Sequence, residues 1–398
     1  MKTKLLIAAT ALLALVACTK NEPTQFAENK DVVSFQTAKY MAQTKAAGSS
    51  VFTYYSFGVY AWSAATAGKY FMDNESVTYQ GDKWLPSTTY YWPREASVDF
   101  VSYYPRVDAS DPRVKIEPDK ITYSNYSVPV PTVDADGAIN DPDYLETNDL
   151  MYADKVVGLS SNGASGAGLT DGKSSYSKVP AYFRHALAKL NVNVRQSFRS
   201  KTITEASGAT TRYKWEVKIN SASIKGVDTM GNLELNLSGE PDSESSCLYP
   251  WKKPANELWS DVSSPISELS IGYGPLDVTN KSILSDLFVM PQALAAGKQQ
   301  LTVNMTIITY RSTDGSEPTE VFLSETCSRT VNLYIDEDYL PTWKMNHNIT
   351  YNLVVVPTAK PKNPGDDPDD PNLDDIVISF DPAVDDWTPV NATASLML

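Results

Sequence analysis

The chain contains very little histidine and cysteine. Among its 398 residues are two histidines, His185 and His347, and three cysteines. Neither histidine has a cysteine or a repeated spacing of carboxylates near it, as a zinc site needs. The sequence also has no Gly-x-Ser-x-Gly elbow, no phosphate-binding glycine-rich loop before a helix and no His-Glu-x-x-His pair. We therefore expect hydrogen-bonded structural histidines, no catalytic residue, no metal and no cofactor.

Basic residues are outnumbered by acidic ones. The chain has 34 lysines and arginines against 48 aspartates and glutamates, which gives a formal net charge of −14. Because nucleic acids attract clusters of lysine and arginine, we expect no nucleic-acid partner. The apolar content of 42% is that of an ordinary globular protein, and a chain of this length can bury two cores of typical domain size.

Long apolar runs are missing except at the start of the sequence. Two lysines precede an apolar run at residues 5–17, which is too short to cross a bilayer as a permanent helix. The run closes on Leu15-Val16-Ala17-Cys18, the pattern read by lipoprotein signal peptidase. We expect residues 1–17 to be a cleaved signal peptide and Cys18 to carry the acyl chains, palmitate among them, that attach the protein to the outer membrane of a Gram-negative cell. The alternative is an ordinary secretory peptide that happens to contain a cysteine.

Two further cysteines, Cys247 and Cys327, remain once Cys18 is lipidated. An exported protein meets an oxidising compartment, in which disulfides form and persist. Their spacing does not predict that they pair, so the question stays open.

Strand-like segments dominate the rest of the sequence. β-branched and aromatic residues alternate with polar ones, and long helical periodicity is nearly absent. In one such segment, residues 98–104, successive side chains point to opposite faces, and Pro105 then ends the strand because proline cannot donate a ladder hydrogen bond. With turn residues at sandwich-like intervals, the pattern predicts a mostly β protein.

Two short segments at opposite ends of the chain are nearly alike: residues 32–36 read VVSFQ, and residues 377–381 read VISFD. With a period of two, each segment places its apolar residues on one face. These residues are Val33 and Phe35 in the first strand, and Ile376, Ile378 and Phe380 in the second. Either strand would fill the same groove, because an open sheet edge accepts an added strand through main-chain hydrogen bonds and side-chain pockets. Exchange between molecules is one interpretation, and coincidence is the other.

A small, polar stretch follows the first of these strands and contains Lys45 and Ala46. Proteases nick chains at such stretches, and this pair suits an enzyme that cuts after a basic residue, with Lys39 as the alternative position. A cut after Lys45 would release the lipid on Cys18 and the first strand together. An uncut loop with an incidental lysine is the other interpretation.

Composition divides the chain into segments. Residues 158–177 are rich in Gly, Ser, Asn, Asp and Thr, and residues 361–375 combine prolines with acidic residues, so both favour solvated linkers. The expected order is a signal peptide at 1–17, a lipidated propeptide with the first strand at 18–45, an N-terminal β-domain at 46–157, a linker at 158–177, a C-terminal β-domain at 178–360, an acidic linker at 361–375 and a C-terminal donor-strand segment at 376–398.

A series of sequence blocks carries a family resemblance over nearly the whole chain. The blocks are the lipobox at Cys18 and residues 35–46, 57–60, 90–93, 99–105, 149–153, 183–190, 289–292 and 343–351. In this order they resemble a fimbrillin, the subunit of the type V pili, or fimbriae, of Bacteroidales. No single block is diagnostic, but their order is.

The resemblance implies two transthyretin-like β-sandwich domains in tandem with a C-terminal strand appendage. It also implies handling by the lipoprotein export machinery, then trimming by an Arg- or Lys-specific protease in the loop after the first strand. The opened groove would take the C-terminal strand of another copy or of another pilin subunit, building a fimbria for cell adhesion. Cleavage in this family usually follows arginine, whereas this chain offers Lys45 or Lys39, which calls for a lysine-tolerant protease.

The C-terminal strand favours a stalk subunit, since a tip subunit has no need to donate a strand. A tip adhesin of the same pilus is one alternative. A surface glycan-binding lipoprotein is another, because the 8 tryptophans and 23 tyrosines include rings that would stack on sugars. Most of these aromatics lie in alternating strand patterns, where packing is their ordinary use. Residues 134–141 resemble the start of a calcium loop but lack its distal bidentate acid, so we expect an acidic surface turn.

Overall fold

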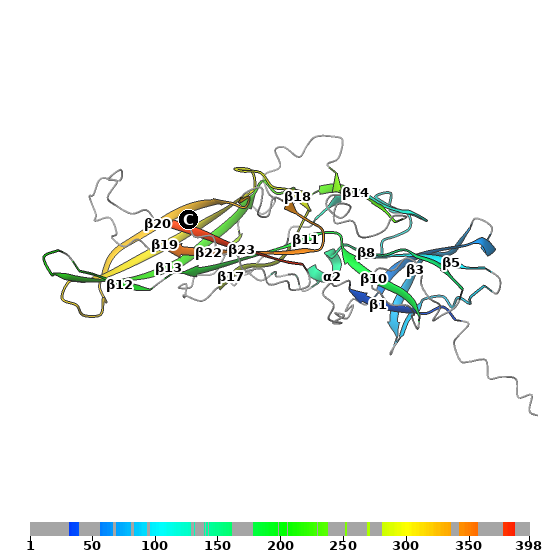
Figure 1. The fold of residues 1–398 in the computed structure, drawn as a ribbon, viewed down its shortest axis with the longest axis horizontal. Helices are drawn as coiled ribbons and strands as arrows, with labels where there is room; N and C mark the ends of the chain where they lie inside the picture. The colour runs from blue at the N-terminus through cyan, green and yellow to red at the C-terminus, as the bar shows by residue number, and fades with distance from the viewer. Residues whose placement is uncertain are drawn as a thin grey trace, which may run out of the picture.

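A computed structural model gives the fold of most of the chain. It describes residues 32–39, 56–66, 69–80, 83–93, 96–128, 131, 139, 141, 143–160, 178–197, 199–204, 206–228, 230–237, 251–252, 269–270, 281–335, 342–356 and 377–386. In β23 (Val377–Asp386), and in the last four residues of β1 (Phe35–Lys39), the description is of the backbone alone. The described chain is almost entirely β and forms an elongated molecule with an N-terminal and a C-terminal lobe (Figure 1). The all-β class predicted from the sequence is confirmed.

The N-terminal lobe is built on one eight-stranded sheet, in the order β2-β3-β4-β1-β10-β8-β5-β9. A further pairing of β2 with β5 closes this order into a ring. Besides β1, its strands are β2 (Ser56–Ser63), β3 (Tyr70–Gln80), β4 (Lys83–Pro86), β5 (Val98–Tyr104), β8 (Met151–Ala153), β9 (Val156–Leu159) and β10 (Val179–His185), and a 3-10 turn, η1 (Ala64–Thr66), follows β2. β5 is buried on both faces, because Phe100 lies in the core inside the ring and Val101 in a second core outside it.

The C-terminal lobe is a sandwich of two sheets. One has the order β17-β11-β22-β23, and the other has the order β12-β13-β19-β20, with β16 paired to β13. The strands are β11 (Ala188–Gln196), β12 (Ser200–Thr204), β13 (Thr210–Lys225), β16 (Leu269–Ser270), β17 (Lys281–Val289), β19 (Gln300–Ser312), β20 (Val321–Asn332), β22 (His347–Val356) and β23. Burial alternates strictly along β11, as a period of two predicts, and its Val192 shares a core with Val217 and Met305 of the facing sheet.

A third sheet joins the two lobes. Its order is β15-β14-β7-β6, so that β14 (Met230–Asn236) from the second half of the chain pairs with β7 (Lys120–Ser127) from the first. The remaining elements are β6 (Val114–Glu117), β15 (Trp251–Lys252), the helix α2 (Tyr144–Asn148) and the pair β18 (Gln292–Ala293) and β21 (Thr342–Trp343). Tyr144 stacks on Phe288 with ring centroids 5.5 Å apart, and the indole N–H of Trp251 donates to the carbonyl of Ala186 at 2.7 Å. These contacts couple the lobes through a shared core.

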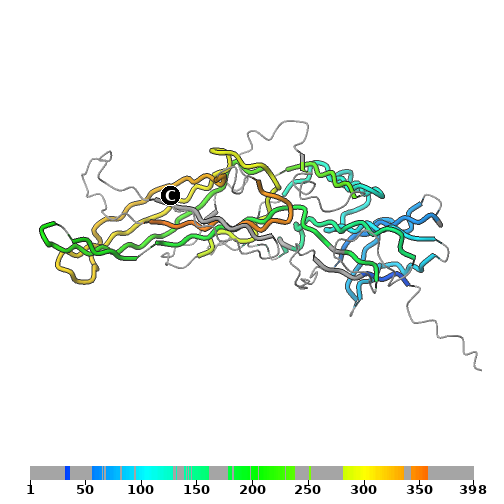
Figure 2. The backbone as a smooth tube through the Cα atoms, viewed as in Figure 1, coloured from blue at the N-terminus to red at the C-terminus, as the bar shows by residue number. Residues whose placement is uncertain are grey.

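The sequence predicts a domain boundary at residues 158–177, but the strand after this segment still belongs to the N-terminal sheet. β10 begins just after this segment, yet it is an inner strand of the N-terminal sheet, and the chain then runs directly from β10 into β11 of the other lobe (Figure 2). The structural passage between the lobes is therefore at residues 186–187. Whether two independently folding domains exist stays a prediction. No helix in the described ranges has the length and apolar character of a membrane span.

Gly226, which directly follows β13, packs closely against the backbone of Lys298 in the C-terminal sandwich. Its φ is +75°, and a Cβ added there would lie 2.0 Å from the carbonyl oxygen of Lys298. Gly297 has the same φ of +75° but nothing within 4 Å of an added Cβ. We expect Gly297→Ala to lower the free energy of unfolding by about 1–2 kcal/mol, the cost of a left-handed alanine, and Gly226→Ala to lower it by about 2–3 kcal/mol more. Urea denaturation of both variants measures the difference, and equal losses would contradict the clash.

Candidate functional site: the terminal strands

The first strand lies inside the N-terminal sheet, between β4 and β10. It runs parallel to β10 over five residue pairs, from Phe35 opposite Val179 to Lys39 opposite Phe183, and it meets β4 where Phe35 lies opposite Trp84. Just before it, the N–H of Val33 donates to the carbonyl of Tyr90 at 2.9 Å. This segment is thus hydrogen-bonded on both sides, as an inner strand must be.

Val33 and Phe35 lie fully inside the core of the ring, on the one face that the alternating pattern assigns them. The ring of Phe35 meets Phe57 and Phe100 edge to face, with centroids 5.7 and 5.8 Å apart. Phe57 in turn contacts Phe183 of β10 at 5.2 Å. Aromatic pairs in this geometry add to the free energy of burial, so Phe35 is the centre of a cluster whose other rings come from three different strands.

The last strand lies at the edge of a sheet in the other lobe. β23 pairs antiparallel with β22 over ten residue pairs, from His347 opposite Asp386 to Val356 opposite Val377. In the described part of the chain β22 is its single neighbour. Ile378 lies opposite Val355 and Phe380 opposite Leu353, whereas Ile376 lies outside the described residues. In this isolated chain the C-terminal strand is docked on its own lobe.

The residues predicted for lipidation and for the preferred cut, Cys18, Lys45 and Ala46, lie outside the described residues. Lys39, the alternative cut position, is the last residue of β1. A cut after Lys39 would fall at the end of the paired strand, and a cut after Lys45 would fall beyond it.

Two buried polar pairs fix β10, the strand beside β1, to the segment that holds β8. Arg184 donates from Nε and Nη2 to the two carboxylate oxygens of Asp154, at 3.0 and 3.1 Å. Next to it, Nδ1 of His185 lies 2.5 Å from Oδ1 of Asp149, and both side chains are 2% exposed. His185 is thus hydrogen-bonded, as predicted. Breaking a buried pair by removing one partner is costly, so these pairs hold one wall of the β1 position rigid.

His347, where β22 begins, has a different environment. Burial, with a smaller effect from the charge of Lys344, lowers the pKa of its imidazole to about 4. It is therefore neutral at neutral pH. Among the described residues no group of three or more His, Cys, Asp or Glu side chains is arranged to hold a metal ion.

Cys327 lies half-buried on β20 and is not in a disulfide. Burial raises the pKa of its thiol, which lowers its reactivity. Cys247 lies outside the described residues.

The sequence does not predict which strands lie on either side of β1. Trp84 of β4 and Phe183 of β10 flank the strand, but they lie about 50 and 150 residues from it along the chain. The alternating pattern marks both as inward-facing strand residues, yet it does not say which strand each one meets. Residues 183–190 contribute to the family resemblance, which does not indicate that this strand lies beside β1.

Comparison with known proteins identifies the family of the chain. A fimbrillin-like family model matches residues 44–387. The chain belongs to the fimbrillin-like family. The resemblance seen in the sequence is therefore confirmed, and it supports a role as a pilus subunit, which is a structural rather than an enzymatic class. No curated protein sequence matches the chain.

Among solved structures, a fimbrial protein of Bacteroides vulgatus is similar to this fimbrillin-like chain, with a TM-score of 0.52 and 15% identity over 90% of this chain and 100% of that one. A protein of Bacteroides uniformis assigned to cell adhesion has a TM-score of 0.41 and 17% identity, covering 90% and 99%. The fimbrial anchor protein Mfa2 of Porphyromonas gingivalis has a TM-score of 0.28 and 12% identity, covering 89% and 97%. The first likeness covers 90% of this chain and the whole of the other, and it concerns the fold.

Phe35 tests the importance of the first strand for stability. Phe35→Ala removes a fully buried ring from the centre of the aromatic cluster, so we expect the free energy of unfolding to fall by about 3–5 kcal/mol. The control is Val321→Ala on β20, a side chain that is 58% exposed and should change the value by less than about 0.5 kcal/mol. Chemical denaturation of the uncut chain measures both, and a loss below about 1 kcal/mol for Phe35→Ala would mean that β1 is dispensable.

Proposed function

We propose that this fimbrillin-like protein is a stalk subunit of a type V pilus, assembled by exchange of β1 for the C-terminal strand of another copy. It is exported as a lipoprotein on Cys18, reaches the outer membrane, and is trimmed after Lys45 by a Lys/Arg-specific protease. The observation that carries the proposal is the unequal placement of the two terminal strands. β1 fills an inner position of its sheet, and β23 lies at an edge.

Loss of β1 would leave the N-terminal sheet incomplete. The backbone groups of β4 and β10 that now face β1 would have no partner, and the pocket around Phe35, walled by Phe57, Phe100 and Trp84, would open to water. Unpaired buried backbone groups and exposed aromatic rings both raise the free energy of the trimmed monomer. An in-chain β1 therefore keeps the subunit inert during export, and its removal makes polymerisation favourable.

β23 is suited to fill the opened position. Its residues 377–381 repeat the pattern of residues 32–36, so that Ile378 and Phe380 would enter the pockets left by Val33 and Phe35. The connection from β22 to β23 spans residues 357–376, and a fully extended chain of that length reaches about 70 Å. This length is enough for the strand to leave its own lobe and reach another molecule.

Exchange of this kind builds a filament. Each subunit gives its last strand and receives one near its first, so the contact is head-to-tail and does not close into a ring. After trimming, the lipid on Cys18 would be lost, and the subunit would be held at the cell surface by its neighbours. A tip adhesin on the same fold would not need residues 376–398, so the presence of a C-terminal strand, β23, favours the stalk role.

A disulfide lock tests whether β23 is the donor. Thr350 of β22 lies opposite Ala383 of β23, at the separation that antiparallel partners share and that a disulfide can bridge. We expect the oxidised double variant Thr350→Cys with Ala383→Cys to be trimmed by a lysine-specific protease but to stay monomeric, because its strand cannot leave. The wild-type chain should give a ladder on an unboiled gel, and a reductant should restore the ladder of the locked variant.

Two controls make the result specific. Thr350→Cys alone should form a ladder with or without oxidant, which separates the lock from the substitution. Lys45→Ala should remain untrimmed and monomeric if the cut follows Lys45. A locked, oxidised variant that still polymerises would show that β23 is not the donor strand.

A further inference from the structure

β20 is a long edge strand of the C-terminal lobe (Figure 1). Its residues 323–332 pair without a break with residues 300–309 of β19, and in the described part of the chain β19 is its single neighbour. The backbone groups along its other edge therefore have no strand of the described chain to pair with. An open edge of this kind is a template for an added strand.

The three other edge strands of this sandwich are short, interrupted or unable to donate at every position. β12 is five residues long, and the pairing of β17 with β11 contains two register shifts. β23 contains Pro382, which has no N–H group. Short strands, bulges, prolines and lysines are the usual means by which proteins keep sheet edges from pairing. Residues 323–332 of β20 contain no proline, no lysine and no bulge.

The pairing with β19 fixes which residues of β20 point their backbone groups outward. The N–H of Leu333, just after β20, donates to the carbonyl of Gln299 at 2.9 Å, in register with the two strands. Because the two directions alternate in an antiparallel ladder, the N–H and C=O of Cys327 and the other odd-numbered residues point toward β19, and those of the even-numbered residues point outward. The hydroxyls of Thr306 and Thr326 agree with this assignment. They lie 3.2 Å apart, and side chains approach most closely at pairs without mutual backbone hydrogen bonds.

The sequence of β20 is complementary to itself when a second copy runs antiparallel along this edge, with Cys327 opposite Cys327. Outward backbone groups then meet outward backbone groups. The opposed side chains join hydroxyl with hydroxyl, apolar with apolar and acid with base: Thr326 with Ser328, Ser324 with Thr330, Leu323 with Val331, and Glu325 with Arg329.

The charges select this register over its neighbours. With Cys327 at the centre, Glu325 of each copy lies opposite Arg329 of the other, so two favourable cross-strand pairs form. The smallest slip that keeps outward groups opposed is two residues, and it puts Glu325 opposite Cys327 or Val331. A slip of four residues puts glutamate opposite glutamate or arginine opposite arginine, which is unfavourable.

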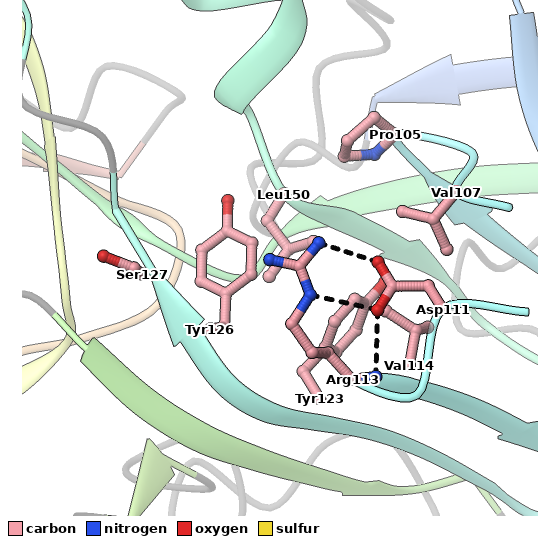
Figure 3. A pocket seen from close by; sticks show the side chains of 9 residues that line it. All are labelled: Pro105, Val107, Asp111, Arg113, Val114, Tyr123, Tyr126, Ser127 and Leu150. Atoms are coloured by element: carbon pink, nitrogen blue, oxygen red, sulfur yellow. Dashed lines mark hydrogen bonds and ion pairs between the residues drawn. The ribbon is translucent and has the colours of Figure 1, made fainter.

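Within one chain these two charges are too far apart to pair with each other. Glu325 and Arg329 are four residues apart on an extended strand, about 13 Å. By contrast, Arg113 donates from Nε and Nη2 to the carboxylate of Asp111 at 3.0 and 2.7 Å in a turn of the other lobe (Figure 3). Arg329 donates from Nη1 to the outward carbonyl of Ser328 at 3.1 Å, so its guanidinium lies at the open edge.

We propose that β20 pairs antiparallel with β20 of a second copy of this chain, about a twofold axis at Cys327. The two sheets become continuous across the contact, which is closed because the same edge serves both partners. β1 and β23 lie in other sheets, so the contact does not depend on strand exchange. In a pilus it would join two filaments side by side, a consequence that rests on the proposed function.

The first test is self-association of the full uncut chain, measured by sedimentation velocity up to about 500 µM. We expect a monomer–dimer equilibrium with a dissociation constant on the order of 100 µM, as for a small interface. Glu325→Lys and Arg329→Glu should each weaken it about tenfold or more, because each variant opposes like charges twice. An equimolar mixture of the two variants should dimerise like the parent, since each supplies the charge that the other needs. Arg113→Glu, a matched charge reversal on the other lobe, should have no effect.

The second test is disulfide trapping of the register. In the variant Cys18→Ser with Cys247→Ser, Cys327 is the sole cysteine, and it lies opposite its copy at a Cα separation of about 4.5 Å, which a disulfide can span. Diamide, which takes up the two protons and two electrons of the paired thiols, should give a covalent dimer. Adding Cys327→Ser and Val331→Cys moves the thiol to another half-buried position, about 26 Å from its copy, so that variant should stay monomeric.

Three results would overturn the proposal. One is a chain that stays monomeric to about 500 µM and gives no disulfide dimer through Cys327. Another is dimerisation that the two charge variants do not weaken, or that their mixture does not restore, which would place the contact elsewhere. A third is equal trapping in the Cys327 and Val331→Cys variants, which would reflect chance collision. All of these measurements use the uncut chain, so they leave the strand-exchange proposal untouched.

Discussion

An inner strand of a sheet must be hydrogen-bonded along both of its edges, and the structure of the N-terminal lobe depends on this requirement at the position of β1. β4 and β10 face each other across the position of β1, and the ring of the N-terminal sheet is continuous because a strand lies there. The N–H of Val33, the carbonyl of Ser34 and the side chain of Phe35 all have partners in the surrounding structure. The fold is therefore complete with its own first strand or with a substitute, and incomplete without either.

The C-terminal strand, β23, is hydrogen-bonded to a neighbouring strand along one edge only. β23 has ten backbone pairs, but all of them are with β22, while β1 has five with β10 and one with β4. Counting backbone pairs does not favour exchange, since the donor gives up a long edge pairing. In the proposed exchange, the driving force would come from the groove that trimming opens, where the aromatic walls around Phe35 would otherwise face water. The contacts of Tyr144, Phe288 and Trp251 couple the two lobes, so the β1 position in one lobe and β23 in the other have a fixed relative geometry.

The sequence predicted the class of fold and the inward face of its first strand, because both follow from a period of two. It likewise predicted the strand at residues 98–104 and its end at Pro105, and both agree with β5. It did not predict that β10 lies beside β1 or that β14 completes a sheet with β7, because alternation fixes which side chains face inward and not which distant strand they meet. The role of Lys45 rests on sequence alone.

Amide hydrogen exchange tests the central claim most directly, by comparing the uncut monomer with the trimmed polymer. In the monomer, the peptide that contains Phe35 should be strongly protected, and the peptide at residues 377–386 less so, because it has one neighbouring strand. In the polymer, the first peptide should be absent, and residues 377–386 should become as protected as Phe35 was in the monomer. A polymer that retains the Phe35 peptide in protected form, with exchange at residues 377–386 unchanged, would contradict the account.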